Sequence, residues 1–415
     1  MPNMVDPAED YDPFSPAAMR DPLPFYARLR RHRPVLYLPA YDAWVLTRFQ
    51  HIFDALSITD NSLLQSEGSL PTPEALRQHN AGPPALPGFE PFVLSQRYGM
   101  PVHGQIRRAH TRPLLPGAVN RLRADVRERA HARLDELLPQ GRFDLTRDYA
   151  GIVASGTIMR LMGMPLDLAA PSLDLVNGGS LADEEQGGVD TAASAAKCVE
   201  LYRPFVARRF EEGADGSLPM IDGLISYRHE GRQLSVTEAA TQLVCAFIGG
   251  IESAPKIAAH GLMELANHQD QLAAVRRDYG AHIPLVAEEI IRYCAPAQWF
   301  VRTVHKPVEI GGQAIDPGQR IFAVIASANR DEREYDDPDR FIWNRRIPRT
   351  LAFGYGMHVC IGVHLARMEV QEMVRAFIER VDEYHVDMEA ARRPPSSFQW
   401  GWNHLPVIID RVATH

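Results

Sequence analysis

The sequence contains few cysteines, and the four that occur lie far apart. They are Cys198, Cys245, Cys294 and Cys360, and no two of them form a Cys-x-x-Cys pair. This spacing argues against a zinc knuckle and against a framework of disulfide bonds. A reducing compartment is therefore expected.

The first 22 residues lack the pattern of a leader peptide. They are acidic and rich in proline, whereas a signal peptide has a basic start followed by an apolar stretch. They also contain no apolar run long enough to cross a bilayer. We therefore expect a cytoplasmic protein that has no membrane partner.

An excess of positive charge is absent as well. The chain has 44 Lys and Arg residues against 52 Asp and Glu residues, which gives a formal net charge of −8. Because phosphate binding needs clustered cations, this balance argues against nucleic acid as a partner. The composition, 45% hydrophobic and 23% charged, is that of a soluble globular protein. A chain of 415 residues is long enough for two subdomains or one large helical body.

The most informative stretch lies near the C-terminal end of the sequence. It reads Phe353-Gly354-Tyr355-Gly356-Met357-His358-Val359-Cys360-Ile361-Gly362. Its three glycines permit positive φ angles and close approach of the backbone, as a tight turn requires. The sequence therefore predicts a turn that surrounds a cysteine.

Apolar residues recur at three- and four-residue steps after this turn, which predicts an amphipathic helix. They are Val363, Ala366, Val370, Met373 and Phe377. Cys360 is thus expected at or just before a helix N-terminus, where partial positive charge and free N–H groups lower the pKa of a cysteine. Such a sulfur suits catalysis or metal ligation, whereas an isolated cysteine is more often a small buried hydrophobic residue.

The stretch 353–362 resembles the haem-binding loop of the cytochrome P450 family, Phe-Gly-x-Gly-x-His/Arg-x-Cys-x-Gly, and matches it at every fixed position. The resemblance implies haem b with the thiolate of Cys360 as the axial ligand of the iron. It implies that Phe353, Gly354 and Gly362 belong to the loop around the cofactor. It also implies one domain over residues 1–415 with the P450 fold, which is mainly α with small β-sheets, a triangular helical body, a long central helix and a smaller β-rich region.

Other segments are assigned in the same way. The stretch at about 57–100 is punctuated by glycine and proline, and long ordered loops tend to be functional; the resemblance implies that it covers the substrate. An N-terminal tail is expected at about 1–20 and lid helices at about 170–212. Aromatic residues at period two within 394–404 predict a terminal hairpin whose tip touches the substrate.

A long central helix is predicted at about 236–268. Ser235 and Glu238 form a capping box pattern at its start, and the run that follows is nearly apolar on all sides. Gly249 and Gly250 lie within it, although each glycine costs about 1 kcal/mol in a helix interior. This cost indicates that the glycines have a functional role, namely to let a planar group or a small ligand approach the backbone closely.

Glu252 and Ser253 follow these glycines and can pass protons to a bound group. The stretch resembles the acid and hydroxyl pair with which the family delivers protons to iron-bound dioxygen, with serine in place of threonine. From the residues alone, a kinked packing helix with a satisfied glutamate remains an alternative.

Four cationic residues are implied as anchors of the haem propionates. His103 and Arg107 lie four residues apart on a predicted helix and share one of its faces; they resemble the family's His-x-x-x-Arg. Arg302 lies on a strand predicted at 297–302 and aligns with the arginine that binds the other propionate. His358 lies in the cysteine loop itself.

A structural ion-pair cluster is expected near the haem loop. Glu289 and Arg292 resemble the family's Glu-x-x-Arg, and Glu289 precedes Cys360 by 71 residues (360 minus 289). Arg340 resembles the third member of a buried Glu-Arg-Arg cluster. These residues are expected to hold the loop in place and not to act in catalysis.

The resemblance implies a haem-thiolate monooxygenase that inserts one oxygen atom of O2 into a small apolar or aromatic substrate, by hydroxylation or O-dealkylation. Electrons come from NAD(P)H through a ferredoxin reductase and a ferredoxin. The residues expected around the substrate are Cys245, Ile248, Gly249, Ala297, Trp299 and Phe300. A basic docking face for the ferredoxin is predicted from Arg107, Arg108, Arg112, Arg345, Arg346 and Arg349.

Two other classes of function remain open. One is a haem-thiolate protein that does not oxygenate with O2 and is instead peroxide-driven, rearranging or ligand-sensing; the altered Ser253-Ala254-Pro255 stretch is its support. The other is a cysteine hydrolase that uses Cys360 and a histidine, which the glycine-rich loop does not favour. Bound haem excludes the hydrolase, and NADH-driven, partner-dependent turnover excludes the first class.

Overall fold

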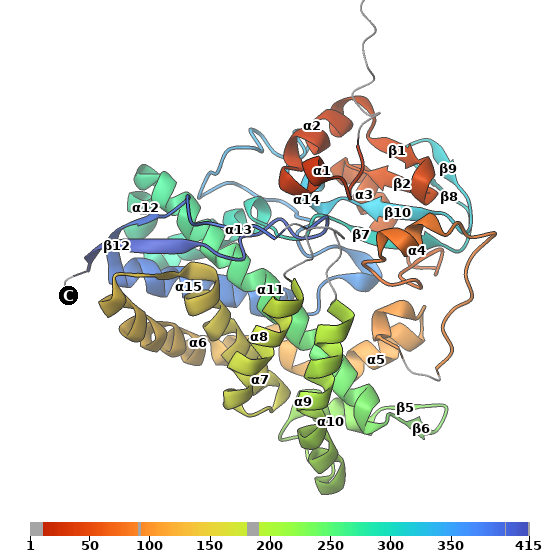
Figure 1. Cartoon of the computed structure of the whole chain (residues 1–415), viewed down its shortest axis with the longest axis horizontal. Coiled ribbons are helices and arrows are strands. Elements are labelled where there is room, and N and C mark those ends of the chain that lie inside the picture. Colours follow the sequence, from red (N-terminus) through yellow and green to blue (C-terminus); the bar gives the residue numbers. More distant parts are fainter. Residues whose placement is uncertain (1–10, 90–92, 181–190, 395, 414–415) are drawn as a thin grey trace, which may run out of the picture.

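Helices make up most of the molecule; the largest sheet lies toward one side of it and a smaller sheet lies at the opposite side (Figure 1). The structure, a computed structural model, describes residues 11–89, 93–180, 191–394 and 396–413. The helices are α1 (Pro16–Arg20), α2 (Leu23–His32), α3 (Phe49–Ser57), α4 (Pro73–Arg77), α5 (Val102–His110), α6 (Pro116–Leu137), α7 (Ile152–Met162), α8 (Ala169–Ser180), α9 (Thr191–Glu212), α10 (Pro219–Ser226), α11 (Val236–Asn267), α12 (Gln269–Arg276), α13 (Tyr279–Tyr293), α14 (Ile325–Ala328) and α15 (Val363–Arg380).

The strands are short. They are β1 (Val35–Leu38), β2 (Ala43–Leu46), β3 (Leu63–Leu64), β4 (Arg142–Asp144), β5 (Arg228–His229), β6 (Arg232–Gln233), β7 (Phe300–Val304), β8 (Val308–Ile310), β9 (Gln313–Ile315), β10 (Arg320–Ala323), β11 (Val381–Val386) and β12 (Pro406–Val412). A π-helical turn, η5 (Leu145–Gly151), precedes α7.

Helix α11 runs through the middle of the molecule (Figure 1). Its start confirms the predicted capping box, because the Ser235 side chain accepts from the Glu238 N–H and the Glu238 side chain accepts from the Ser235 N–H. The helix packs against α7, α9, α13 and α15. It continues through Pro255, although a proline has no N–H to donate to the carbonyl four residues earlier, that of Ile251.

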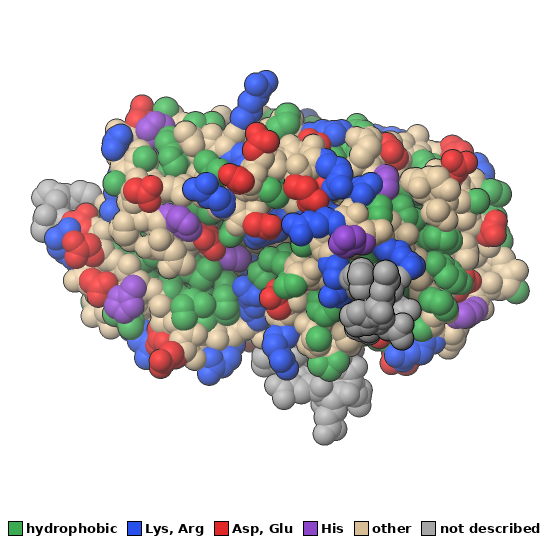
Figure 2. Space-filling view, turned by 90° about the horizontal axis from the view of Figure 1, so that it is seen from above, with side chains coloured by type: hydrophobic (Ala, Val, Ile, Leu, Met, Phe, Trp, Pro, Cys, Tyr) green, Lys and Arg blue, Asp and Glu red, His purple; other side chains and the backbone are tan. Residues whose placement is uncertain are grey.

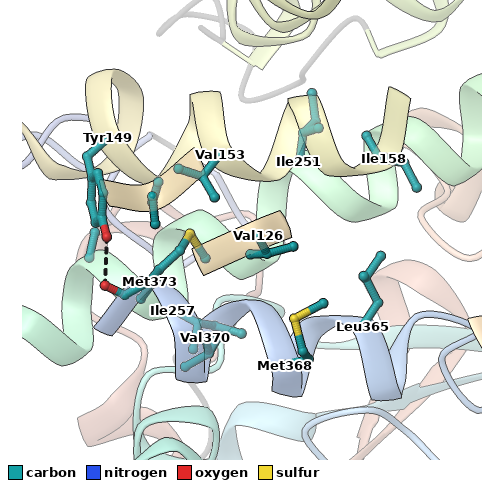
Figure 3. Packing of buried hydrophobic residues seen from close by; sticks show 14 of the residues in the cluster. Val126, Tyr149, Val153, Ile158, Ile251, Ile257, Leu365, Met368, Val370 and Met373 are labelled. Carbon is teal, nitrogen blue, oxygen red and sulfur yellow. Dashed lines mark hydrogen bonds between the residues drawn. The ribbon is translucent and has the colours of Figure 1, made fainter. Parts of the chain in front are cut away.

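The largest hydrophobic cluster joins α11 to α6, α7 and α15 (Figure 3). Ile251 and Ile257 of α11 belong to the same cluster as Met368 and Val370 of α15. The hydroxyl of Tyr149 donates to the Met373 carbonyl at 2.7 Å, which satisfies a phenol that is otherwise buried. Helix α15, which follows the cysteine loop, is thus fixed on several sides.

A five-stranded sheet in the order β1-β2-β10-β7-β3 forms the β-rich part. Strands β10 and β2 pair in parallel, with Ile321 opposite Trp44, whereas β10 and β7 pair antiparallel. A second hydrophobic cluster covers this sheet and includes Tyr11 and Ala18, which are 4% and 3% exposed. The prediction of a tail over 1–20 is therefore wrong from residue 11 onward, because apolar side chains there pack onto the sheet; residues 1–10 lie outside the described residues.

The segment predicted as a substrate-covering loop at 57–100 contains β3, α4 and firm anchors. The buried guanidinium of Arg320 donates to Glu67 at 2.7 and 3.1 Å, and to the carbonyls of Leu76 and Gln78 at 3.1 and 2.9 Å. Residues 90–92 of this segment, and residues 181–190 of the predicted lid, lie outside the described residues. The first half of the segment is thus held to the sheet.

The stretch 394–404 is closed by an antiparallel bridge between Arg392 and His404, as a hairpin requires, with backbone hydrogen bonds of 2.8 and 3.1 Å between the two residues. The stretch also pairs with another segment, through the bridge Ala297–Gln399. Its neighbour Arg393 places its guanidinium 3.6 Å from the ring centre of Trp400 and 4.2 Å from that of Trp402. The predicted contact of the tip of this hairpin with the substrate stays a prediction.

Charged side chains of both signs mingle on the face shown in Figure 2, as the similar numbers of acidic and basic residues predict. Among the described helices, none combines the length and the apolar character needed to cross a membrane.

Replacing Gly261 by alanine tests the contact between α11 and α13. A Cβ at this position would lie 2.5 Å from Ile290 Cγ2, so Gly261→Ala forces the helices apart and lowers the free energy of unfolding by roughly 1–3 kcal/mol. Gly117→Ala in α6 is the control, since nothing lies within 4 Å of its added Cβ. Urea unfolding of both variants is the measurement, and equal stability of the two would contradict the predicted contact.

Candidate active site

The cysteine loop is a tight turn that leads into α15. Gly354 and Gly356 have φ angles of 66° and 67°, and a Cβ on Gly356 would lie 2.0 Å from the Leu56 carbonyl oxygen. The Cys360 N–H donates to the Phe353 carbonyl at 2.9 Å and closes the turn. Gly362, the N-cap of α15, has a φ of −89°, so it does not need positive φ as the sequence suggested.

Cys360 has an accessible side chain although protein surrounds it. Burial raises the pKa of its thiol, while the Gly362 backbone and the charge of Arg107 act in the opposite direction. The expectation of a lowered pKa is thus wrong for the side chain by itself, because desolvation outweighs the helix N-terminus. A metal ion would be the larger local charge and would favour the thiolate.

Two arginines and a neutral imidazole beside the loop form what we call the cationic group, whose charge comes from the arginines: Arg107 of α5, Arg302 of β7 and His358. Burial and the charges of Arg302, His103 and Arg107 lower the pKa of His358 to about 2, and burial lowers the pKa of Arg302 to about 10. In the described part of the chain, neither arginine has a carboxylate partner. Uncompensated buried cations are costly, so this group is suited to bind anions.

The ring nitrogens of His358 sharpen this conclusion. Both are buried and neither has a hydrogen-bond partner among the described residues. A small hollow is lined by His358 and Arg302 together with Tyr355 and Met357. Since buried polar atoms are normally satisfied, the pair is arranged for a polar ligand.

His103 is engaged differently. Its Nδ1 lies 2.9 Å from the Ser95 carbonyl oxygen and its Nε2 lies 3.1 Å from that of Met357. Its ring also lies 4.6 Å from the ring of His358. With both nitrogens at carbonyl oxygens, His103 supports the cysteine loop, and its expected contact with a propionate stays a prediction.

One face of α11 is accessible within an otherwise buried stretch. Cys245, Ile248, Gly249, Glu252 and Ser253 are partly or fully accessible at three- and four-residue steps, whereas Phe247 and Ile251 between them are buried. A Cβ on Gly249 would meet nothing within 4 Å. The stripe therefore borders open space, and it brings together the two predicted catalytic residues and three of the predicted pocket residues.

The other predicted pocket residues follow α13. Ala297 pairs with Gln399, and the ring of Phe300 lies 5.5 Å from that of Phe398. Trp299 is 2% exposed, packs on Phe322, and belongs to the second hydrophobic cluster. Its assignment to the pocket is wrong, because successive strand residues point to opposite faces and Trp299 faces the cluster.

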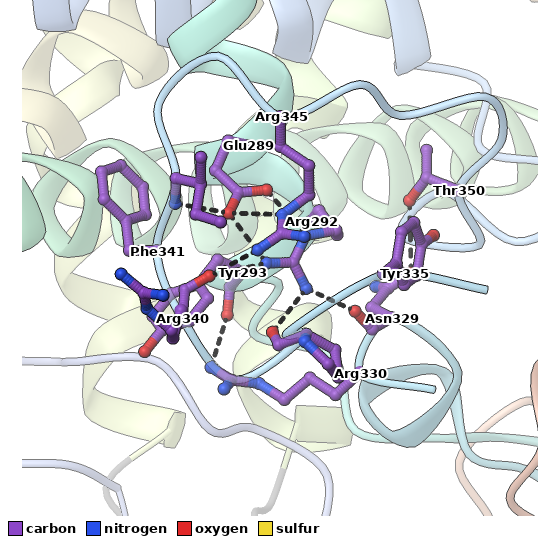
Figure 4. A network of polar contacts seen from close by, with 12 residues as sticks. Glu289, Arg292, Tyr293, Asn329, Arg330, Tyr335, Arg340, Phe341, Arg345 and Thr350 are labelled. Atoms are coloured by element: carbon purple, nitrogen blue, oxygen red, sulfur yellow. Dashed lines mark hydrogen bonds and ion pairs between the residues drawn. The ribbon is translucent and has the colours of Figure 1, made fainter. Parts of the chain in front are cut away.

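Glu289 and Arg292 of α13 form a fully buried ion pair (Figure 4). Their contacts are 2.7 and 2.8 Å, and Arg292 also donates to the Asn329 and Pro338 carbonyls. The third member is Arg345, whose Nε lies 3.1 Å from Glu289 and whose side chain is 6% exposed. Arg340 is 75% exposed and pairs with Asp337, so its assignment to the cluster is wrong.

The docking face also changes in composition. Arg345 belongs to the buried cluster, and Arg107 to the cationic group. Arg349 lies over the ring of Phe53 at 5.1 Å and pairs with Glu334 at 2.8 Å. The remaining predicted arginines, Arg108, Arg112 and Arg346, are exposed.

Comparison with known proteins gives the site its context. A family model described as Cytochrome P450 matches residues 192–405, more than half of the chain. The chain belongs to the cytochrome P450 family. It is 29% identical over 416 residues to the putative cytochrome P450 123 of Mycobacterium tuberculosis, covering 98% of each chain. It is 28% identical to the β-dihydromenaquinone-9 omega-hydroxylase of that organism, covering 91% of this chain and 74% of the hydroxylase. The solved structure of cytochrome P450 CYP109Q5 from Chondromyces apiculatus has a TM-score of 0.79 at 25% identity, covering 98% and 99% of the two chains.

The protein thus has the P450 fold and is a cytochrome P450 monooxygenase, an oxidoreductase. Members of this family hold haem through a cysteine thiolate. The residues present fit that group: an accessible thiol, a cationic group suited to carboxylates, and open space at Gly249. In the part of the chain that the structure describes, neither nitrogen of His358 has a hydrogen-bond partner, so this imidazole is not paired with the thiol as the base of a cysteine hydrolase would be.

Sequence reasoning missed two residues. Arg345 follows the chosen Arg340 by five positions in an irregular segment, and only the pairing with Glu289 distinguishes them. Lys256 lies one helical turn after Glu252 and is 5% exposed. The sequence could have indicated Lys256, because a lysine four residues after Glu252 in an otherwise apolar helix needs a polar partner.

The two arginines offer a matched pair of variants. Arg345→Leu leaves the buried Glu289 carboxylate short of one partner and lowers the free energy of unfolding by roughly 3 kcal/mol or more. Arg340→Leu removes an exposed charge and changes stability by about 0.5 kcal/mol or less. Chemical unfolding followed by circular dichroism is the measurement. The reverse order of the two effects would restore Arg340 to the cluster.

Proposed function

We propose that this cytochrome P450 binds haem b through Cys360 and inserts one oxygen atom of O2 into a small apolar or aromatic substrate, by hydroxylation or O-dealkylation. The observation that carries the proposal is the accessible Cys360 thiol before α15, next to a cationic group without a carboxylate partner in the described chain. A thiol beside such a group suits a metal-containing cofactor that carries carboxylates.

The residues divide the work of holding the cofactor. Cys360 would supply the sulfur ligand of the iron, and the cationic group of Arg107, Arg302 and His358 would bind the propionates. The Arg367 guanidinium lies 5.0 Å from the ring centre of Phe353, and its Nε lies 2.7 Å from the Glu288 carboxylate. These contacts hold the Phe353 side chain in place. When bound, a thiolate-ligated haem activates dioxygen for insertion of an oxygen atom.

Glu252 and Ser253 are the residues that hold and move protons in this proposal. Both lie on the accessible stripe of α11. Pro255 deprives the Ile251 carbonyl of its helical donor, so a polar acceptor is left on the same turn, where water can bind. A hydroxyl, a carboxylate and a carbonyl within two turns suffice for a short proton path.

The substrate is proposed to lie along Cys245, Ile248 and Gly249, with Ala297 and Phe300 beside it. These side chains are small or apolar, and the Cys245 thiol is occupied by Gln96 at 3.8 Å. Such a lining selects by shape and apolar area, which supports a compact apolar or aromatic molecule. The M. tuberculosis relative named above is, by its name, a hydroxylase of β-dihydromenaquinone-9.

The absorption spectrum of the reduced protein with carbon monoxide tests the proposal. The wild type is expected to give a strongly red-shifted Soret band, because thiolate ligation moves the band of the carbon monoxide complex. Cys360→His is expected to give the shorter-wavelength band of an imidazole ligand. A wild-type band at the shorter wavelength, or no bound haem, would refute Cys360 as the ligand. Product formed with NADH rather than with peroxide then separates oxygenation from the peroxide-driven alternative.

Electron supply is proposed to come from NAD(P)H through a reductase and a ferredoxin that docks at Arg108, Arg112 and Arg346. Arg112→Glu is expected to slow reduction several-fold at low salt and less at high salt, since screening weakens the attraction. Stopped-flow reduction by a ferredoxin is the measurement. Arg411→Glu in β12 is the control, because its side chain is 60% exposed and the charge change is equal. Equal rates for both variants would remove the proposed face.

A further inference from the structure

Lys256 differs from the other lysines of the chain. The sequence has Lys197, Lys256 and Lys306, and the structure places Lys197 and Lys306 at the surface. Lys256, in α11, is 5% exposed. Burying an ammonium group is costly unless hydrogen bonds and an opposite charge compensate. The partners of Lys256 therefore indicate what it does.

The first partner is Gln399. The Lys256 ammonium donates to the Gln399 side-chain oxygen. The stem of Lys256 lies directly under Gly401, because a Cβ there would lie 2.9 Å from Lys256 Cβ and Cδ. The aliphatic part of Lys256 therefore fits beside position 401 only because that residue is glycine.

Gln399 belongs to a segment that lies against the proposed substrate side. The Gln298 N–H donates to the Phe398 carbonyl at 2.8 Å, and the Trp400 N–H donates to the Pro296 carbonyl at 2.7 Å. Ala297, a proposed pocket residue, pairs with Gln399 between these two bonds. Lys256 thus holds the segment 396–401 to the central helix at the level of the pocket.

The other group that acts on Lys256 is the charge of Glu252, which lies four residues earlier on the same face of α11. Burial lowers the pKa of Lys256, and the charge of Glu252 acts in the opposite direction by favouring the ammonium form. A neutral amide and this carboxylate are the polar groups that act on Lys256 in the described chain. The attraction between the Lys256 ammonium and the Glu252 carboxylate acts on both side chains.

We propose that Lys256 is a positioning residue for the Glu252 carboxylate, and that it ties this acid to the segment 396–401 through Gln399. The proposal rests on the proton-delivery role given to Glu252 above. One ammonium proton is used by Gln399, which leaves the others for the carboxylate one turn back. Glu252 is thereby held on the stripe that carries Ser253, and its position depends on the segment beside the substrate.

The proposal has a consequence for electron use that needs no organic substrate. One NADH, one proton and one O2 give H2O2 and NAD+, whereas two NADH, two protons and one O2 give two H2O and two NAD+. The second outcome requires protons at the reacting oxygen before peroxide escapes. Loss of Lys256 is therefore expected to shift the products from water toward peroxide.

The experiment compares wild type, Lys256→Met, Glu252→Gln and the double variant, with Lys306→Met as the control at a surface lysine. Peroxide formed and NADH consumed are measured with a ferredoxin system, in H2O and in D2O. Lys256→Met is expected to raise the ratio of peroxide to water by about tenfold, since general acid–base groups contribute about 10²- to 10⁴-fold and Lys256 controls part of this. It is also expected to increase the solvent isotope effect on NADH consumption, which a purely structural lysine would not alter. Added to Glu252→Gln, it should change neither quantity further.

Thermal unfolding gives a second readout that does not depend on electron supply. Removing either charge abolishes the attraction between the two, so the Tm decrease of the double variant is expected to be smaller than the sum of the two single decreases. Additive Tm shifts, or a peroxide ratio and isotope effect equal to those of Lys306→Met, would overturn the proposal. If the thiolate spectrum is absent in the wild type, the proposed function fails instead, and the Tm cycle still reports on the Lys256–Glu252 pair.

Discussion

The buried carboxylate of Glu289 is the constraint on which the position of the cysteine loop depends. It accepts from Arg292 and Arg345 and from the Ile342 N–H at 2.9 Å. Arg292 donates in turn to the Asn329 carbonyl at 2.7 Å, and the Asn329 side chain accepts from the Leu351 N–H at 3.2 Å, two residues before Phe353. Ion pairs and hydrogen bonds thus connect helix α13 to the residues that lead into the cysteine loop. Breaking a buried pair leaves an uncompensated charge, so the cluster tolerates few arrangements.

The cysteine loop and the central helix could be predicted because their signals are local. A glycine turn, a capping box and helical periodicity each arise within a few residues, and the structure has the turn, the box and α11 where they were expected. The P450 family and fold followed from the same stretch. Trp299 could also have been placed correctly, since strand alternation puts Trp299 and Val301 on one face and Phe300 and Arg302 on the other.

Other features had no local signal. The choice between Arg340 and Arg345 depends on a carboxylate about fifty residues earlier in the chain, and both arginines lie in an irregular segment without a period. The pKa of the Cys360 thiol is raised because burial outweighs the helix N-terminus, and burial is a property of the whole fold. Likewise, the burial of Lys256 depends on the segment 396–401, which covers it from a distant part of the sequence.

The stacking of Arg393 on Trp400 and Trp402 gives the protein an internal optical reporter. The chain has five tryptophans; these two lie in or next to the segment that holds Gln399, and Trp299 donates to the Ser397 carbonyl at 2.7 Å in the same segment. Indole emission depends on nearby charge and on water contact. Displacement of the segment by a bound molecule would alter the surroundings of three of the five indoles together. The intrinsic fluorescence of the unlabelled protein is therefore expected to change when a molecule binds beside this segment.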